Sequence, residues 1–231
     1  MGRLGRRTTF ASTVITLALV SCAPGGSGSA GPEPDRSARP DAAAATLLAM
    51  LPDGLGQAVV SLEPLAEAAS VASEPAPELA PELAPAIVIE QFARTFYPRM
   101  VIAATGQQVR FGNGDDTEHN VRVTRTQTQA VVINVDLMHD DEIEHRFGQT
   151  GTYSVRCDMH PGMMALVLVV SHPYAAIAND RGSFRVEEIP AGSYLLTAWG
   201  VEGARILQRQ VQVRADANGD LAMSSIASDQ Q

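Results

Sequence analysis

Two stretches of the chain decide its fold: "VRFGNGDDTEHNV", residues 109–121, and "GTYSVRCDMHPGMMALVLVV", residues 151–170. Each stretch predicts a strand, a short loop and the beginning of a second strand. The second stretch contains Cys157, with a histidine three residues later and a methionine three residues after that. This cluster of soft donors around one thiol has three readings: a metal site, a catalytic nucleophile, or a buried cysteine that packs as a small apolar residue.

The sequence around these stretches consists of short runs rich in apolar and β-branched residues. Turns rich in Gly, Asn and Asp separate the runs, as at 112–116 and 148–151. Strands at this spacing, without long helical periods, predict an all-β protein built as an antiparallel sandwich or barrel. The predicted runs are 86–98, 100–113, 119–126, 130–137, 142–157 and 163–170.

The composition excludes several kinds of partner. The chain has 231 residues and a formal net charge of −9. Such an acidic chain lacks the basic face that binds nucleic acid or anionic lipid, so we expect neither as a partner.

The first 22 residues predict an export signal. Three arginines in the first seven residues precede the apolar run "FASTVITLALV", which is too short to span a bilayer. "LVSC", residues 19–22, resembles the box of bacterial lipoproteins, in which the cysteine is lipidated; the alternative is an ordinary signal peptide that is cut nearby. The resemblance implies an exported protein that a lipid on Cys22 anchors in the bacterial cell envelope, facing the periplasm or the exterior. Cys157 would then have no disulfide partner.

The donors around Cys157 favour copper. A thiolate, two imidazoles and a weak axial thioether are the ligand set of a mononuclear His₂Cys copper site. Cys157, His160 and Met163 can come from one loop, and His119 is the candidate for the second imidazole. The nucleophile reading lacks a visible oxyanion hole or orienting acid, and zinc more often takes carboxylate with imidazole in exported proteins. We therefore expect one copper ion and no enzymatic activity.

The two quoted stretches resemble the blue copper proteins, the cupredoxins of the plastocyanin and amicyanin type, over residues 86–170. The family pattern is a Phe-x-Asn turn, His-Asn-Val, then Gly-x-Tyr-x-x-x-Cys-x-x-His-Pro and a methionine. The resemblance implies a Greek-key cupredoxin sandwich, and the short spacing from cysteine to methionine matches amicyanin. The copper ligands that it implies are His119, Cys157, His160 and Met163.

The resemblance also assigns supporting roles. It implies that the backbone N–H of Asn120 donates to the sulfur of Cys157. Asn113 should tie its turn to the ligand loop through the side-chain amide, and Pro161 should stiffen that loop.

Other histidines and methionines could compete for the metal. Met164 stays open as an alternative axial ligand to Met163, whereas the short loop would strain Met159 as a ligand. We interpret two other histidines as surface residues in an acidic neighbourhood and one as a hinge residue, and assign none to copper: His139, His145 and His172.

A second β-rich segment follows residue 171. "NDRGSFRVEEIPAGSYLL", residues 179–196, resembles the sandwich repeats of the carboxypeptidase regulatory-like type, and "GQAVVSLEPL", residues 56–65, resembles an early strand of the same sandwich. Cupredoxins with such a segment are labelled methylamine-utilisation-type proteins. The cupredoxin would then be inserted in a second sandwich; the alternative is a hairpin extension that covers an open sheet edge.

These observations divide the chain into seven predicted segments. A short helix is also expected within the second segment, over 42–51. The segments are a lipoprotein signal (1–22), a flexible tether (23–53), a strand of the accessory β domain (54–66), a Pro/Glu/Ala linker (67–84), the cupredoxin (85–171), the carboxypeptidase regulatory-like segment (172–215) and a disordered tail (216–231).

The sequence therefore predicts a monomeric, lipid-anchored carrier of single electrons. Its partner would be a periplasmic dehydrogenase, cytochrome or oxidase, and the exposed edge of His160, ringed by Pro161, Gly162 and Met164, would be the electron port. The alternative from another class is a periplasmic Cu(I) carrier, since thioethers prefer Cu(I). A purely structural, adhesion-like module would leave the placement of the ligands unexplained.

Overall fold

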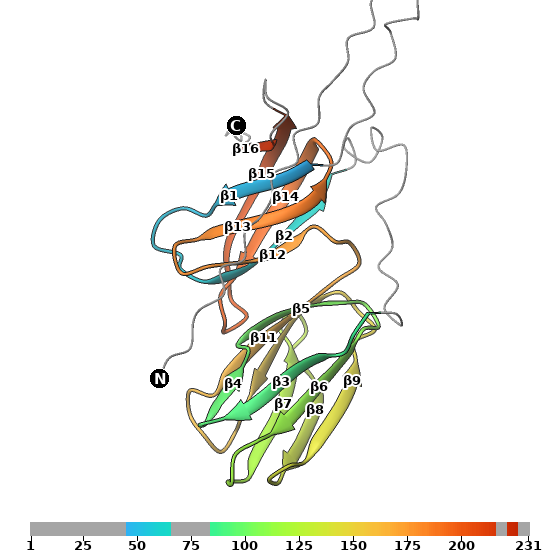
Figure 1. Ribbon diagram of the computed structural model, residues 1–231, viewed down its shortest axis with the longest axis vertical. Helices are drawn as coiled ribbons and strands as arrows, with labels where there is room; N and C mark the ends of the chain where they lie inside the picture. Colours follow the sequence, from blue (N-terminus) through green and yellow to red (C-terminus); the bar gives the residue numbers. More distant parts are fainter. Residues whose placement is uncertain (1–44, 66–83, 216–220, 226–231) are drawn as a thin grey trace, which may run out of the picture. The chain divides into compact units, whose positions relative to one another are not determined.

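The computed structural model describes residues 45–65, 84–215 and 221–225, so Cys22 and the predicted signal lie outside the described residues. The regular structure in these ranges is all β, which confirms the predicted fold class (Figure 1). No described helix is long and apolar enough to cross a bilayer. In chain order the strands are β1 (Ala45–Met50), β2 (Ala58–Pro64), β3 (Ile87–Phe92), β4 (Thr95–Tyr97), β5 (Met100–Ala104), β6 (Gln108–Asn113), β7 (His119–Arg125), β8 (Ala130–Leu137), β9 (Glu142–Arg146), β10 (Gly151–Arg156), β11 (Met164–Val170), β12 (Ala175–Ala178), β13 (Ser183–Ile189), β14 (Gly192–Trp199), β15 (Arg205–Ala215) and β16 (Leu221–Ser225).

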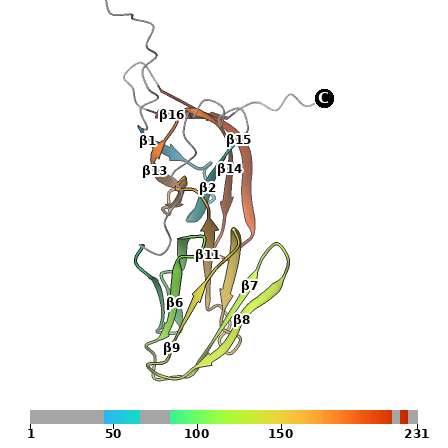
Figure 2. The same ribbon diagram turned by 90° about the vertical axis from the view of Figure 1, so that its right-hand side faces the viewer.

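Strands β3 to β11 form two sheets, which we call the inserted sandwich. One sheet has five strands in the order β5-β11-β10-β7-β8, and the other has four in the order β4-β3-β6-β9. Figure 2 shows β7 and β8 as a long hairpin, and their pairing is antiparallel. Side chains of both sheets, including Ile89, Phe111 and Val155, are fully buried in one apolar core cluster.

The predicted strand run 86–98 is broken into β3 and β4 by a two-residue turn. Phe92 pairs with Thr95, and the two residues between them, Ala93 and Arg94, have φ angles of 51° and 56°. Turns of this left-handed conformation usually carry Gly or Asn, because other L-residues rarely adopt it. Ala93 and Arg94 are neither, so nothing in the sequence marked the turn.

Strand β11 is buried on both faces, which explains its uninterrupted apolar sequence. Ala165, Val167 and Val169 point into the core of the inserted sandwich. The alternate residues of β11 lie in a separate apolar cluster with Val59 of β2 and, at its margin, Trp199 of β14. The members of that cluster from β5 and β11 are Met100, Leu166, Leu168 and Val170.

The remaining strands form one seven-stranded sheet in the order β12-β2-β14-β15-β16-β1-β13. Two of its strands precede the inserted sandwich in the chain and five follow it, as the colours of Figure 1 show. Residues 58–64 form one strand within the predicted run 56–65. Strands β3 to β11 therefore interrupt the chain of a second β unit.

Two expectations at the ends of this sheet are wrong. The predicted helix over 42–51 is strand β1 in its described part, and the strand lies within the range assigned to the tether. Leu47 of β1 is fully buried and pairs with Val186 of β13, so tertiary pairing overrides the helix propensity of an Ala- and Leu-rich run. Residues 221–225 of the predicted disordered tail form β16, which pairs along β15.

Candidate metal centre

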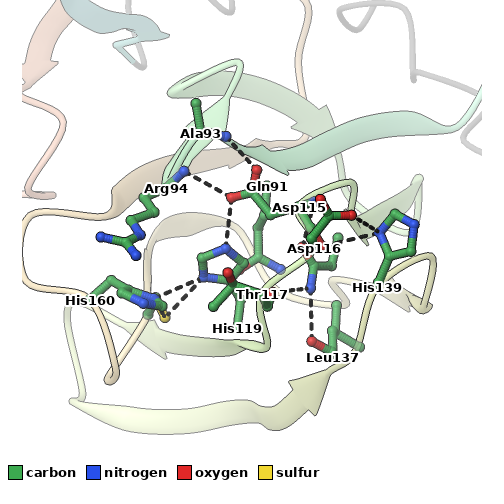
Figure 3. Close-up of polar contacts among 12 residues, drawn as sticks. Gln91, Ala93, Arg94, Asp115, Asp116, Thr117, His119, Leu137, His139 and His160 are labelled. Carbon is green, nitrogen blue, oxygen red and sulfur yellow. Dashed lines mark hydrogen bonds and ion pairs between the residues drawn. The ribbon is translucent and has the colours of Figure 1, made fainter.

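The donor side chains come from one end of the inserted sandwich. His119 is the first residue of β7, and Cys157 directly follows β10. His160 lies in the loop between β10 and β11, and Met163 is the last residue before β11. Figure 3 shows a ring nitrogen of His119 pointing toward a ring nitrogen of His160, with the sulfur atom beside them; the two rings meet edge to face.

Three donor atoms converge at this end. The Nδ1 atoms of His119 and His160 are 2.9 Å apart. The sulfur of Cys157 lies 3.6 Å from Nδ1 of His160 and 3.9 Å from Nδ1 of His119. Protein ligands bind a small transition metal at roughly 2.0 Å through nitrogen and 2.3 Å through sulfur, so donors on one ion lie about 4 Å apart or less. All three separations meet this condition, and a single ion fits among the donors.

The centre is buried except at one ligand. His119 is fully buried, Cys157 is nearly so, and both lie on strands or strand ends that pack in the core. His160 is half-buried, and the loop residues beside it are exposed. Solvent and other molecules therefore reach the donors mainly from the side of His160.

The backbone of the ligand loop places Met163 on the inner face. The N–H of Met163 donates to the carbonyl of His160, and the N–H of Cys157 donates to the carbonyl of Met163. The side chain of Met163 is buried in the same core cluster as Cys157, whereas Met164 begins the opposite face of β11. Met159 is 43% exposed and is not a member of that core cluster.

Asn120 supports the thiol in the way that the resemblance implies. Its backbone N–H lies 3.4 Å from the sulfur of Cys157. The side-chain amide donates to Asn134 and Asp136 of β8, and its oxygen accepts from the backbone N–H of Asp158 at 3.4 Å. This one residue thus holds β7, β8 and the start of the ligand loop together around the sulfur.

The expectation for Asn113 is wrong in its target. Its side-chain amide donates to the carbonyls of Thr117 and Leu137, both at 2.9 Å, and to no residue of the ligand loop. Asn113 therefore closes the turn before His119 onto the end of β8. It positions His119, whereas Asn120 positions Cys157.

Sequence reasoning missed Asp115. A carboxylate oxygen of Asp115 lies 2.8 Å from Nε2 of His119, on the side of the ring that faces away from the other donors (Figure 3). Burial alone would raise the pKa of Asp115, but hydrogen bonds from Arg94, His119 and Ala93 outweigh it and hold the pKa below its usual range. The carboxylate is therefore ionised at neutral pH. The only signal in the sequence is its spacing, four residues before the histidine.

The protonation of His160 also suits metal binding. Desolvation is the main effect that lowers the pKa of His160, the neighbouring His119 and Arg94 lower it further, and Asp115 opposes them. Metal binding needs the neutral imidazole, which a lowered pKa favours.

The other histidines lie apart from these donors. His139 is exposed, contacts Asp116 and Asp140, and approaches the carbonyl of Asp115 at 3.1 Å. His145 is half-buried against Phe147, so it is less exposed than expected. His172 stacks on Tyr174 just before β12.

Comparison with known proteins gives likenesses in structure alone. No protein-family model matches the chain, and no curated protein matches it. A purple cupredoxin from Nitrosopumilus maritimus is 25% identical, over 36% of this chain and 99% of its own, with a TM-score of 0.33. Amicyanin from Paracoccus versutus is 23% identical, over 40% of this chain and 91% of its own, with a TM-score of 0.34. The copper-containing nitrite reductase of Thermus scotoductus is 23% identical, over 37% of this chain and 22% of its own, with a TM-score of 0.35.

The donors themselves define the class of site. Within the described ranges, the donor atoms of His119, Cys157 and His160 lie close enough together to share one metal ion. With Met163 they make a His₂Cys–Met arrangement, which is typical of a mononuclear type 1 copper site.

Proposed function

We propose that the protein binds one type 1 copper ion through His119, Cys157, His160 and Met163 and transfers single electrons between redox partners. The observation that carries the proposal is the convergence of one thiol and two imidazole nitrogens at one end of the β sandwich. Bound copper would supply a one-electron couple and an intense thiolate charge-transfer band.

The residues around the site hold the donors in place. Asn120 fixes the sulfur of Cys157, Asn113 fixes the turn before His119, and Asp115 contacts the far nitrogen of the His119 ring. Because these contacts are part of the sheets and turns, the donors keep one geometry when the charge of the site changes. A small rearrangement is what rapid transfer of single electrons requires.

The exposure of His160 supports its proposed role as the point where electrons enter and leave the site. His160 is the one ligand of the converging three that solvent reaches, and the exposed loop residues Met159, Pro161 and Gly162 surround it. A small surface of this kind suits a brief redox encounter, which buries little area. We propose this surface as the contact with a redox partner.

The setting that we propose is the bacterial cell envelope. The segment "LVSC" supports lipidation at Cys22, and the cationic and apolar residues before it support export. A periplasmic dehydrogenase, cytochrome or oxidase would be the electron donor or acceptor, and the acidic net charge of −9 disfavours nucleic acid.

The first test is the visible and EPR spectrum of residues 23–231 loaded with Cu(II). We expect an intense thiolate band and narrow copper hyperfine splitting, and we expect Cys157→Ser to lose both because the sulfur donor is gone.

The exposed Met159 beside His160 favours the alternative, a Cu(I) carrier, because thioethers prefer Cu(I). A protein that stays colourless with Cu(II) but gives Cu(I) up to a chelator would support that alternative against ours.

The axial ligand can be tested with a matched pair of methionine variants. Because Met163 is buried beside Cys157 and Met164 lies on the other face of β11, we expect Met163→Ala to shift the thiolate band and the reduction potential. Met164→Ala should leave both nearly unchanged. Voltammetry and absorption spectra of the two variants measure this, and the reverse result would make Met164 the axial ligand.

A further inference from the structure

The turn between β3 and β4 is strained and lies next to the metal centre. Both of its residues, Ala93 and Arg94, have left-handed φ angles, which Gly, Asn and Asp adopt far more easily. Such a conformation persists only where the surrounding structure enforces it, and strain of this kind concentrates at functional sites.

One carboxylate enforces this turn. The backbone N–H of Ala93 donates to Oδ1 of Asp115 at 2.6 Å, and the N–H of Arg94 donates to Oδ2 at 2.9 Å. The backbone between these segments is also joined, because the N–H of Gly114 donates to the carbonyl of Gln91 at 2.9 Å. The turn and Asp115 therefore form one unit, although more than twenty residues separate them in the chain.

The same carboxylate contacts a metal ligand. Oδ2 of Asp115 lies 2.8 Å from Nε2 of His119, and the side chain of Asp115 is only 15% exposed. A proton on Nε2 that is donated to this oxygen leaves Nδ1 unprotonated, facing Cys157 and His160. A carboxylate partner also makes the imidazole a stronger donor, which favours the more positive metal oxidation state.

We propose that Asp115 is a positioning residue: held by the Ala93–Arg94 turn, it fixes the tautomer and orientation of His119 and stabilises Cu(II) relative to Cu(I). This inference rests on the proposed function for its redox part. Its structural part, the tautomer of His119, concerns the protein without metal.

Asp115→Asn tests the proposal and Asp116→Asn is its control. Asp116 is the next residue, its side chain is fully exposed, and the substitution changes the net charge by the same amount. In Asp115→Asn we expect the Cu(I):Cu(II) ratio at a fixed applied potential to rise at least about threefold and Cu(II) affinity to fall roughly 10- to 100-fold. Asp116→Asn should change the ratio much less. Equal shifts in the two variants would overturn the proposal, because net charge alone would then explain them.

A redesigned turn separates positioning from simple support of the fold. Ala93→Asn with Arg94→Gly places the residue pair that this turn geometry prefers, so the turn no longer depends on the carboxylate. Added to Asp115→Asn, the pair should restore thermal stability but leave the Cu(I):Cu(II) ratio shifted. If it restores the ratio as well, Asp115 acts only by supporting the hairpin and the proposal is wrong.

A measurement on the apoprotein keeps the inference apart from the copper hypothesis. By NMR, the Nε2–H of His119 should give a slowly exchanging proton signal in the wild-type protein and in Asp116→Asn, and lose it in Asp115→Asn. If copper gives no blue site but this signal follows Asp115, the proposed function fails and the positioning role stands. If the signal is absent from the wild-type protein or unchanged by Asp115→Asn, the positioning role fails whatever the copper spectrum.

Discussion

Replacing His119 with alanine is expected to abolish the thiolate band and to weaken Cu(II) binding by at least about 100-fold, since loss of even an outer partner of a metal ligand costs roughly 10- to 100-fold. The ring supplies one of the three donor atoms that converge in the site, and it is fully buried, so no neighbouring exposed side chain replaces it. Competition against a chelator of known Cu(II) affinity measures the loss.

His139→Ala is the matched control for this prediction. His139 also lies beside Asp115, with Nδ1 3.1 Å from its backbone carbonyl, but it is exposed and is not among the converging donors. Its replacement should change Cu(II) affinity less than about twofold. Comparable losses in the two variants would contradict the ligand assignment and indicate a site on the acidic surface around His139.

Leu166→Ala is expected to lower the free energy of unfolding by about 2–5 kcal/mol, the range for truncation of a buried leucine. Leu166 is fully buried in the cluster that joins β11 and β5 to residues of the seven-stranded sheet, such as Val59. The cavity would therefore weaken packing between strands of the inserted sandwich and the chain around it. Urea denaturation, followed by circular dichroism, measures the change.

The same substitution at an exposed leucine is the control for this prediction. Leu48 of β1 is 68% exposed, so Leu48→Ala should change the free energy of unfolding by less than about 0.5 kcal/mol, as surface substitutions usually do. Equal effects of the two substitutions would contradict burial of the outer face of β11. Two separate unfolding transitions, with only one affected, would show that the cluster does not couple the two β units.

Local patterns in the sequence were enough to predict most of the site. The spacing of Cys157, His160 and Met163 places the three on one loop, and the apolar run after Met163 predicts a strand that is buried throughout. His119 could be chosen because it begins a strand after a polar turn. The loop ligands and the buried strand depend on residues close together in the chain. The choice of His119 depends on its position at the start of a strand, which the other histidines in the chain do not share.

The features that sequence reasoning missed depend on contacts between distant segments. The role of Asp115 exists only because the path of the chain brings the 93–94 turn beside it. Asn113 donates to Leu137, twenty-four residues away, and no local pattern indicated which carbonyl it would reach. Residues 45–50 have a composition that suits a helix and become a strand because β13 offers them a pairing edge.

The left-handed turn at Ala93 and Arg94 also limits the order in which this protein can change over evolution. While both positions keep residues that disfavour the turn, a substitution of Asp115 would release the hairpin and the copper ligand together, so it would be selected against. Once Asn or Gly enters the turn, only the ligand depends on the carboxylate. Homologues that lack an acidic residue at position 115 should therefore carry Asn or Gly at 93 or 94, and this covariation should appear before any drift in the four donors.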